Sequence, residues 1–294
     1  MSDSLRYAVV TPARNEAKDL PRLAAALASQ TLPPAIWVIA DDGSTDDTAD
    51  IMGAVHAEHP WAQLVAREAA GTEGGLANGR REGRALLGFR AGLEALQEPV
   101  DVFIKMDADI DFDHDYCEQL VQRFADDPAL GIASGTCYEL EGGEWVRRTK
   151  ADSTVWGASR AYRWNCLEDV RALEPRMGWD GIDEVRVQLR GMRTETFVEL
   201  PFRHNRPEGG RENTSVHHWS RLGRACWYMG YRPSYLTMRA LYRTRRSPAA
   251  LFMLWGYAAA AAARTPRCRD ATVIAALRER QRFSSALRRG APSS

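Results

Sequence analysis

Residues 100–109, VDVFIKMDAD, decide the fold that we expect for this chain. The apolar run reads as a buried β-strand, and it ends in two carboxylates one residue apart, Asp107 and Asp109. Because residues i and i+2 of an extended chain point to the same side, both carboxylates can face one hard cation such as Mg²⁺ or Mn²⁺. Two such acids also suit a solvated loop or a helix cap. Their place directly after a hydrophobic strand favours a metal site.

The sequence before this stretch alternates between strand-like and helix-like patterns. Strands are predicted at residues 7–12, 36–40 and 64–66, and helices at 20–27, 48–59 and 81–97. A glycine-rich loop at residues 71–79 precedes the third helix. This alternation predicts an α/β fold of Rossmann-like type, with a mostly parallel central sheet and helices on both faces. Residues 100–106 then form its fourth strand.

Polar residues follow three strands of the predicted sheet. Asn15 comes after the first strand, Asp42 after the second and Asp107 after the fourth. In open α/β sheets, ligands bind beyond the carboxyl ends of the strands. The sequence therefore predicts a ligand site at this edge. The turn at residues 41–46, DDGSTD, also has a simpler role as a turn and helix N-cap, which still leaves one acid at the strand end for a ligand.

The order of the elements becomes less regular after this point. We predict a strand at 130–138, a tryptophan-rich segment at 156–164, a helix near 183–189, a strand near 195–200, and helices from residue 213 onward, the last near 270–289. These patterns divide the chain into a catalytic domain, residues 1–212, and a C-terminal helical extension, residues 213–294.

Composition excludes several classes of protein. Lys plus Arg and Asp plus Glu both total 39, so there is no global positive field that would attract nucleic acid. The five cysteines are an odd number without a CxxC pair, which indicates neither a disulfide framework nor a zinc ribbon. The N-terminus lacks the pattern of a signal peptide. We expect a cytoplasmic protein.

The longest apolar stretch, residues 248–263, is shorter than the roughly twenty residues of a membrane-spanning helix. It follows an arginine cluster at residues 239–246. One interpretation is a helix that lies on the inner face of the cell membrane, with the arginines at the headgroups. The other is a helix packed against the catalytic domain or against a partner in a homodimer. Both stay open at this stage.

Three motifs together resemble a known family. Residues 9–16, VVTPARNE, the DDGSTD turn, and residues 106–109, MDAD, stand in the order found in the nucleotide-binding half of family 2 glycosyltransferases of GT-A fold. This group includes dolichol-phosphate mannose synthases and many bacterial polysaccharide enzymes. The resemblance covers residues 7–200. It implies a nucleotide-sugar donor, such as a UDP-, GDP- or dTDP-sugar, and a divalent metal, Mn²⁺ or Mg²⁺.

The resemblance also implies roles for single residues. It places a set of side chains beside the donor nucleotide: Thr11, Pro12, Arg14, Glu16, Asp42, Lys105 and Asp107. Within this set, Asp42 would contact the base, and Asp107 the ribose or the metal. Asp109 would bind the metal. Residues 1–111 would thus form the donor half of the catalytic domain, and residues 112–212 the acceptor half.

The catalytic base is expected in residues 179–184, WDGIDE, where inverting members of the family place a Glu-Asp pair. This chain has Ile182-Asp183 instead, so the paired form is absent, and Asp183 is the expected base. A carboxylate at a helix start can deprotonate an acceptor hydroxyl without forming a covalent intermediate. Asp180 is the alternative base. In another interpretation, Asp183 only stabilises the N-terminus of a helix.

The loop at residues 204–211, HNRPEGGR, offers further ligands. His204 is a candidate third metal ligand, although a single histidine is more often structural. Arg206 or Arg211 is a candidate clamp for the diphosphate, because a guanidinium matches phosphate oxygens in a fork. Basic residues within 79–84 are candidates for a phosphate contact as well.

The resemblance thus implies an inverting, metal-dependent hexosyltransferase that serves polysaccharide or glycolipid biosynthesis. Processive relatives have a Q-x-x-R-W box, which this sequence lacks, so transfer of single sugars to a saccharide or lipid-linked acceptor is expected. A nucleotidyltransferase is the nearest enzymatic alternative, but it needs a glycine-rich loop after the first strand, and residues 13–16 contain no glycine. An inactive sugar-nucleotide-binding or scaffold protein is the other alternative.

Overall fold

The computed structural model describes residues 5–66, 80–96, 98–148, 154–206, 215–245 and 247–282. The chain forms two compact units. The first comprises Met1–Gly74, Arg84–Leu173 and Arg190–Glu208, and the second comprises Gly75–Gly83, Glu174–Leu189 and Gly209–Ser294. The last segment of the second unit begins near the predicted domain boundary, but this unit also contains Asp183. The predicted glycine-rich loop at 71–79 lies outside the described residues.

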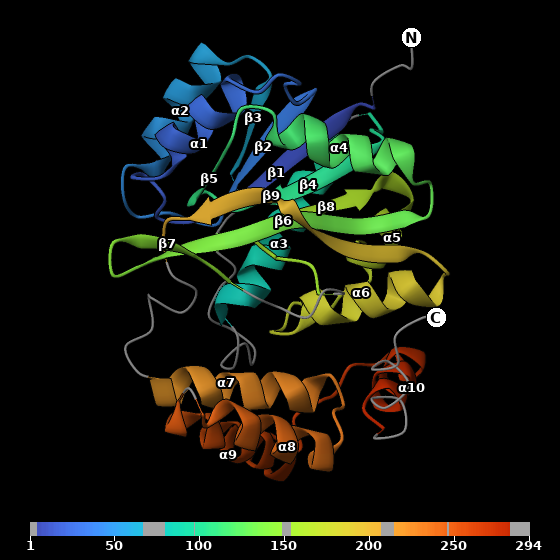
Figure 1. The fold of residues 1–294 in the computed structure, drawn as a ribbon. Coiled ribbons are helices and arrows are strands. Elements are labelled where there is room, and N and C mark those ends of the chain that lie inside the picture. The colour runs from blue at the N-terminus through green and yellow to red at the C-terminus, as the bar shows by residue number, and fades with distance from the viewer. Residues whose placement is uncertain are drawn as a thin grey trace. The chain divides into compact units, whose positions relative to one another are not determined.

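The first unit is built on one mixed β-sheet (Figure 1). In the described part of the chain, the strand order is β3-β2-β1-β4-β8-β6-β9-β5, and β7 pairs with β6. The strands β1, β2, β3 and β4 are parallel to one another, which confirms the predicted α/β sheet. Beyond β4, β8 is antiparallel to both of its neighbours, and β6 and β9 are parallel to each other. The strands are β1 (Tyr7–Ala13), β2 (Ile36–Asp41), β3 (Ala62–Ala66), β4 (Val102–Met106), β5 (Ile110–Phe112), β6 (Leu130–Glu141), β7 (Glu144–Arg147), β8 (Ser159–Arg163) and β9 (Arg193–His204).

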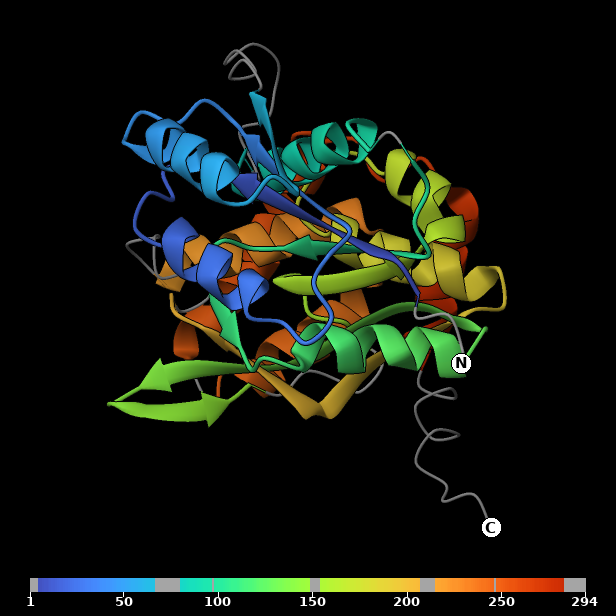
Figure 2. The ribbon, with the colours of Figure 1, turned by 90° about the horizontal axis from the view of Figure 1, so that it is seen from above.

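Helices cover both faces of this sheet. The helices α1 (Leu20–Ala28), α2 (Thr48–Glu58) and α4 (Tyr116–Asp126) lie on one face, and α3 (Arg80–Glu94) and α5 (Leu167–Arg171) lie on the other (Figures 1 and 2). A short 3₁₀ helix, η1 (Trp164–Cys166), leads into α5. Side chains of β1 alternate between the faces, so that Tyr7 and Val9 enter the core below α1 and Val10 meets α3. A strand covered on both sides is apolar almost throughout, as the sequence of β1 is.

Two glycines let α3 approach the sheet closely. A Cβ atom on Gly88 would lie 3.1 Å from Cβ of Pro12, and one on Gly92 would overlap Cγ1 of Val10. Because both glycines lack that atom, the helix backbone packs directly on β1. This contact supports the strand whose carboxyl end leads to the Asn15 turn.

The structure corrects several expected boundaries. Helix α6 (Trp179–Leu189) begins four residues earlier than predicted, so Asp183 lies in its second turn and not at its start. Strand β9 continues to His204, which was expected in a loop, because Ile110 of β5 and Glu139 of β6 both pair with that residue. The helix α4 was missed, although its buried residues Tyr116, Leu120 and Phe124 recur at helical spacing. The short strands β5 and β8 depend on pairing with distant partners, and β7 forms a hairpin with the end of β6; the sequence did not reveal these three strands.

The second unit is helical in its described part. It contains α6, α7 (Ser215–Tyr228), α8 (Pro233–Arg243), the 3₁₀ helix η2 (Pro248–Leu251), α9 (Phe252–Ala262) and α10 (Ala271–Arg280). The helices α7 and α9 cross at Gly223 and Gly256, where an added Cβ would overlap the carbonyl group of Met253 or Ser220. A separate core of apolar side chains joins α7, α8 and α9: Cys226, Leu236, Ala240, Met253 and Tyr257. No helix among the described residues is both long and apolar enough to cross a membrane.

Candidate functional site

The turns after β1 and β2 are bound to each other at one edge of the sheet. Asn15 adopts a left-handed backbone conformation with φ of 54°. Its side-chain oxygen accepts a hydrogen bond from the Thr45 amide at 2.8 Å. The Glu16 amide donates to the Thr48 hydroxyl at 2.8 Å. Because β1, β2 and β4 are parallel neighbours, the turn that contains Asp107 ends at the same edge, as the sequence predicts.

Three side chains with metal-ligand atoms meet beside this edge. The ligand atoms of Asp107, Asp109 and His204 all lie within 4.8 Å of one another. The Asp107–Asp109 segment is a turn between β4 and β5 and not the extended strand that we expected, yet both carboxylates belong to this group. His204 joins them because β5 pairs with β9 in a register that sets Ile110 opposite His204. Two carboxylates and one imidazole suit a divalent cation.

Asp109 is buried and bound by two cationic side chains. His204 Nε2 lies 3.2 Å from its Oδ1, and Arg206 Nε donates to its Oδ2 at 2.6 Å. Burial alone would raise the pKa of this carboxyl, but the hydrogen bonds and charges of His204 and Arg206 outweigh burial and lower its pKa. Its backbone carbonyl accepts a hydrogen bond from the Asn205 amide at 2.9 Å. Asp109 is therefore held ionised in a fixed position.

Arg206 lies among three acids. Besides Asp109, it pairs with Glu16 and stands 3.5 Å from Asp19 Oδ2. Burial raises the pKa of Glu16 to about 7, although the charge of Arg206 opposes that shift. The guanidinium proposed as a diphosphate clamp is thus engaged with carboxylates in this structure. Arg211, the other candidate clamp, lies outside the described residues.

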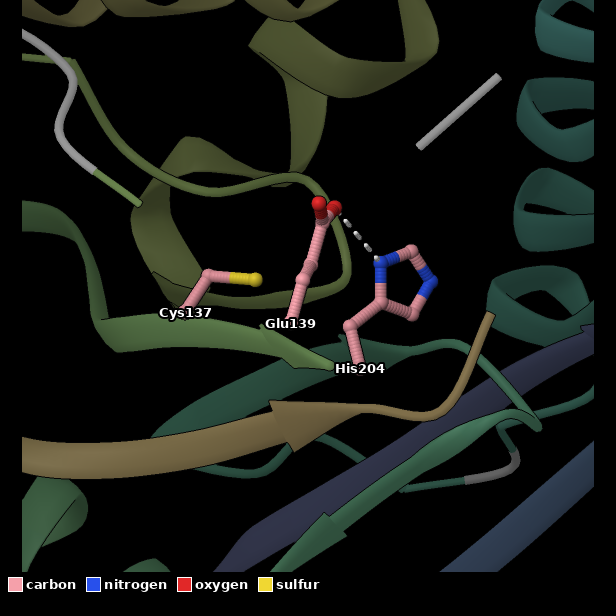
Figure 3. A group of neighbouring side chains, drawn as sticks. All are labelled: Cys137, Glu139 and His204. Atoms are coloured by element: carbon pink, nitrogen blue, oxygen red, sulfur yellow. Dashed lines mark ion pairs between the residues drawn. The ribbon is translucent and has the colours of Figure 1, made fainter. Parts of the chain in front are cut away.

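The other side of the His204 ring faces β6. Figure 3 shows Glu139 directed toward the His204 ring, and Cys137 beside Glu139 on the same strand. Glu139 Oε1 lies 3.8 Å from His204 Nδ1. These three side chains form a second group of ligand-type atoms within 4.8 Å. Burial lowers the pKa of His204, but hydrogen bonds with Asp109, Cys137 and Glu139 raise it to about 12. With this raised pKa both ring nitrogens carry a proton at neutral pH, so a metal that binds Nε2 would have to displace the proton on that nitrogen.

Glu139 was missed by the sequence analysis. Glu139 is 3% exposed, and its Oε2 accepts a hydrogen bond from Arg148 Nε at 2.6 Å. The sequence did contain a clue to Glu139. Every second residue of a strand faces the same side, so if the strand predicted at 130–138 continues by one residue, Cys137 and Glu139 share a face. Register with β9 then sets Glu139 opposite His204, and only the fold reveals this.

Lys105 lies behind Asp107. Its ammonium group pairs with the Asp107 carboxylate and donates to the Gly157 carbonyl at 2.8 Å. Lys105 is 3% exposed, whereas the Asp107 side chain is 34% exposed. Lys105 therefore orients Asp107 from inside the protein and leaves one side of that carboxylate open.

Asp42 is buried between two arginines. Its Oδ2 lies 3.7 Å from Arg14 Nη1 and 3.6 Å from Arg84 Nε, and Arg14 also donates to its backbone carbonyl at 3.0 Å. Arg84 is the last residue of the stretch 79–84, in which basic residues were candidates for a phosphate contact; residue 79 lies outside the described residues. The structure thus brings Arg14, Asp42 and Arg84 together at the end of β2.

Thr11 and Pro12, which were expected beside the donor nucleotide, both pack against neighbouring elements of the fold. Thr11 is fully buried, and its hydroxyl accepts a hydrogen bond from Trp37 Nε1 at 2.9 Å. Its side chain therefore belongs to the core between β1 and β2. Pro12 packs against α3 at Gly88.

Asp183 belongs to the second unit. It is fully buried within α6, and its Oδ1 accepts a hydrogen bond from the Glu184 amide at 2.6 Å. Asp180, the alternative base, lies in the first turn of the same helix and is partly exposed. α6 packs against α10 of the same unit.

A family model described as glycosyl transferase family 2 matches residues 8–177, which is more than half of the chain. The chain belongs to glycosyl transferase family 2. The match includes the turns with Asn15 and Asp42 and the Asp107–Asp109 segment, so the three motifs of this family 2 glycosyltransferase lie within it. A comparison with curated proteins gave no match.

Solved structures show that this family 2 glycosyltransferase has the GT-A fold. The mannosyltransferase PcManGT from Pyrobaculum calidifontis, in complex with GDP-Man and Mn²⁺, matches 98% of this chain and 85% of its own, with 17% identity and a TM-score of 0.55. The S. aureus TarS fragment 1-349, in complex with UDP, matches 76% of this chain with 15% identity and a TM-score of 0.54. This chain spans 64% of the length of that TarS chain. At such identities the likeness concerns the fold.

Proposed function

We propose that this chain transfers a single sugar from a nucleotide-sugar donor to an acceptor hydroxyl, with inversion at the anomeric carbon and with a divalent metal held by Asp107, Asp109 and His204. The observation that supports it most is the meeting of these three ligand groups at the strand edge where the Asn15 and Asp42 turns also end. Family membership supplies the reaction class.

The chemistry of the side chains suits a metal–diphosphate complex. Asp109 is held ionised by its cationic neighbours, and Asp107 keeps an open side. A bound Mn²⁺ or Mg²⁺ would neutralise charge on the leaving nucleoside diphosphate, which is Lewis-acid chemistry. Carboxylate ligands such as these two suit Mn²⁺ and Mg²⁺. PcManGT in complex with GDP-Man and Mn²⁺ supports the same pairing of donor and metal.

The Asp42 region would hold the nucleoside. The Asp42 carboxylate lies between Arg14 and Arg84, so the carboxylate has little freedom to move when a nucleotide enters. A carboxylate held in this way can accept hydrogen bonds from a base or a ribose without losing side-chain entropy on binding. TarS in complex with UDP supports a uridine nucleotide as one candidate donor. The base and the sugar are left to the experiment below.

Asp183 remains the proposed general base, and Asp180 the alternative. The proposal rests on the family resemblance of residues 179–184 and on the chemistry of inversion, in which one carboxylate accepts the proton of the acceptor hydroxyl.

The test is a thermal-shift screen of UDP-, GDP- and dTDP-sugars with and without Mn²⁺ or Mg²⁺. A ligand that binds only the native state raises Tm, because it increases the free energy of unfolding. At a ligand concentration 100 times Kd this increase is about 2.7 kcal/mol. We expect one donor to stabilise the protein only when metal is present. Asp109→Asn should abolish this metal-dependent part.

Asp111→Asn is the matched control, because Asp111 is a neighbouring acid of β5 outside the ligand group. It should leave the shift unchanged. A shift that survives in Asp109→Asn would overturn the metal assignment. Nucleotide binding without transfer to any acceptor would favour the inactive binding protein instead.

A further inference from the structure

The C-terminal helices concentrate positive charge. Between Glu212 and Asp270 the sequence contains ten arginines and neither Asp nor Glu, although acids and bases balance over the whole chain. This segment includes α7, α8, η2 and α9. Two of its arginines, Arg243 and Arg245, follow each other closely at the end of α8, and both are exposed. Such a segment attracts anions locally even though the net charge of the protein is zero.

Large apolar side chains are exposed on the same helices. Tyr242 is 68% exposed and Trp255 is 59% exposed. Single exposed apolar residues are ordinary, but a cluster of them on adjoining elements indicates an interaction surface. The exposed set belongs to α8, η2 and α9: Met238, Leu241, Tyr242, Leu251, Phe252 and Trp255.

These side chains lie on the outer sides of packed helices. On α8, Met238 and Tyr242 are one helical turn apart, while Leu236 and Ala240 enter the core. On α9, Trp255 is exposed between the buried Met253 and Tyr257. The helix α8 contacts both η2 and α9, and their inner sides share one core. We call the six exposed apolar side chains, with Arg243 and Arg245, the arginine–aromatic face.

We propose that the arginine–aromatic face docks on the surface of a bilayer that contains anionic lipids. Arginines bind lipid phosphates through paired hydrogen bonds, and Trp and Tyr prefer the boundary between headgroups and acyl chains. Leu251, Phe252 and Trp255 would enter that boundary, while Arg243 and Arg245 stay at headgroup level. The lack of acidic residues over this segment favours an anionic surface over an ordinary protein partner, whose contact patch would have charges of both signs.

The test is co-sedimentation of the full chain with vesicles of phosphatidylcholine alone and of phosphatidylcholine mixed with phosphatidylglycerol. We expect binding to the mixed vesicles alone, and weaker binding as salt is added. The double variant Arg243→Glu/Arg245→Glu should bind roughly tenfold more weakly or worse. Trp255→Ser/Phe252→Ser should lose binding even at low salt, because it removes the apolar contact.

Trp145→Ser is the matched control, since Trp145 is 40% exposed on β7 in the first unit. It should bind vesicles like the wild type. Equal binding to both kinds of vesicle, or binding that survives all the substitutions, would overturn the proposal. So would a homodimer that dissociates in Trp255→Ser/Phe252→Ser, because the face would then bind a second copy. Thermal unfolding checks that each variant folds. Nucleotide binding by the same variants, which we expect to be unchanged, separates this proposal from the proposed function.

Discussion

Glu139 and His204 are opposite each other on the parallel strands β6 and β9, with Glu139 Oε1 3.8 Å from His204 Nδ1. The other ring nitrogen of His204 lies 3.2 Å from Asp109 Oδ1. A carboxylate that faces the N–H of one ring nitrogen of a histidine fixes the ring so that the other nitrogen can bind a metal. Glu139 therefore holds His204 in the orientation that the proposed metal site needs.

The first prediction concerns Glu139. Glu139→Gln should weaken Mn²⁺ binding by about 10- to 100-fold, because removal of the partner of a metal-binding histidine costs that much in known sites. Titration calorimetry with Mn²⁺ measures it. Glu141→Gln is the matched control: Glu141 also pairs with Arg148, but its side chain is 51% exposed and it is not in either ligand group. Equal Mn²⁺ affinity in both variants would contradict the role of Glu139.

The second prediction concerns the base. Asp183→Asn should lower kcat by about 100- to 10,000-fold and leave donor affinity unchanged, because loss of a general base slows only the step that transfers the proton. Steady-state kinetics at several pH values measures it, and the acidic limb of the pH–rate profile should vanish. Asp180→Asn is the comparison. A larger loss of kcat in that variant would assign the base to Asp180, and a fall in Tm for Asp183→Asn would point to a structural role.

The third prediction concerns Thr11. Thr11→Val should destabilise the protein by about 1–3 kcal/mol, because it leaves the buried Trp37 indole N–H without its acceptor. Urea unfolding measures the loss. If the hydroxyl serves the core alone, the folded variant binds the nucleotide as tightly as the wild type. A large loss of nucleotide affinity would show that Thr11 contacts the donor as well.

The fourth prediction concerns the glycines of α3. Gly92→Ala should destabilise the protein by about 1–3 kcal/mol, because the added methyl group overlaps Val10 of β1. Gly53→Ala in α2 is the control, since nothing lies within 4 Å of a Cβ there. It should stabilise the helix by up to about 1 kcal/mol. Urea unfolding of both variants should therefore give changes of opposite sign, and equal changes would contradict the packing of α3 on β1.

The fifth prediction concerns pH and the start of α10. Asp270 accepts hydrogen bonds from the Thr272 and Val273 amides and pairs with Arg186. Partial burial alone would raise its pKa, but these partners outweigh burial and lower it. A lowered folded pKa means that its stabilisation is complete above the unfolded value of about 3.9 and is lost as pH falls through the folded pKa.

Asp270→Ala should therefore cost about 1 kcal/mol at neutral pH and progressively less as pH falls below that value. Urea unfolding at a series of pH values measures the difference. Asp270→Asn keeps a side-chain acceptor for the cap and loses the charge, so its cost should be smaller than that of Asp270→Ala. A cost that does not change with pH would contradict the role of the ionised carboxylate.

Much of the donor side could be predicted from local pattern. The strands β1, β2 and β4 follow from short continuous apolar runs, and the helices between them follow from apolar residues at helical spacing. Because parallel strands end at a common edge, the juxtaposition of the turns at Asn15, Asp42 and Asp107 followed as well. Short elements such as β5 and β8 could not be predicted, because they exist only through pairing with distant strands.

The sequence by itself determined the order of the βα units and the place of Asp107 and Asp109 after a buried strand, since these depend on neighbouring residues. Only the tertiary structure decided which partners those acids meet. Arg206 pairs with Glu16, which is 190 residues away. His204 stands between Asp109 of the β4–β5 turn and Glu139 of β6. Such contacts depend on strand order and register across the sheet, and a local pattern of burial contains no information about either.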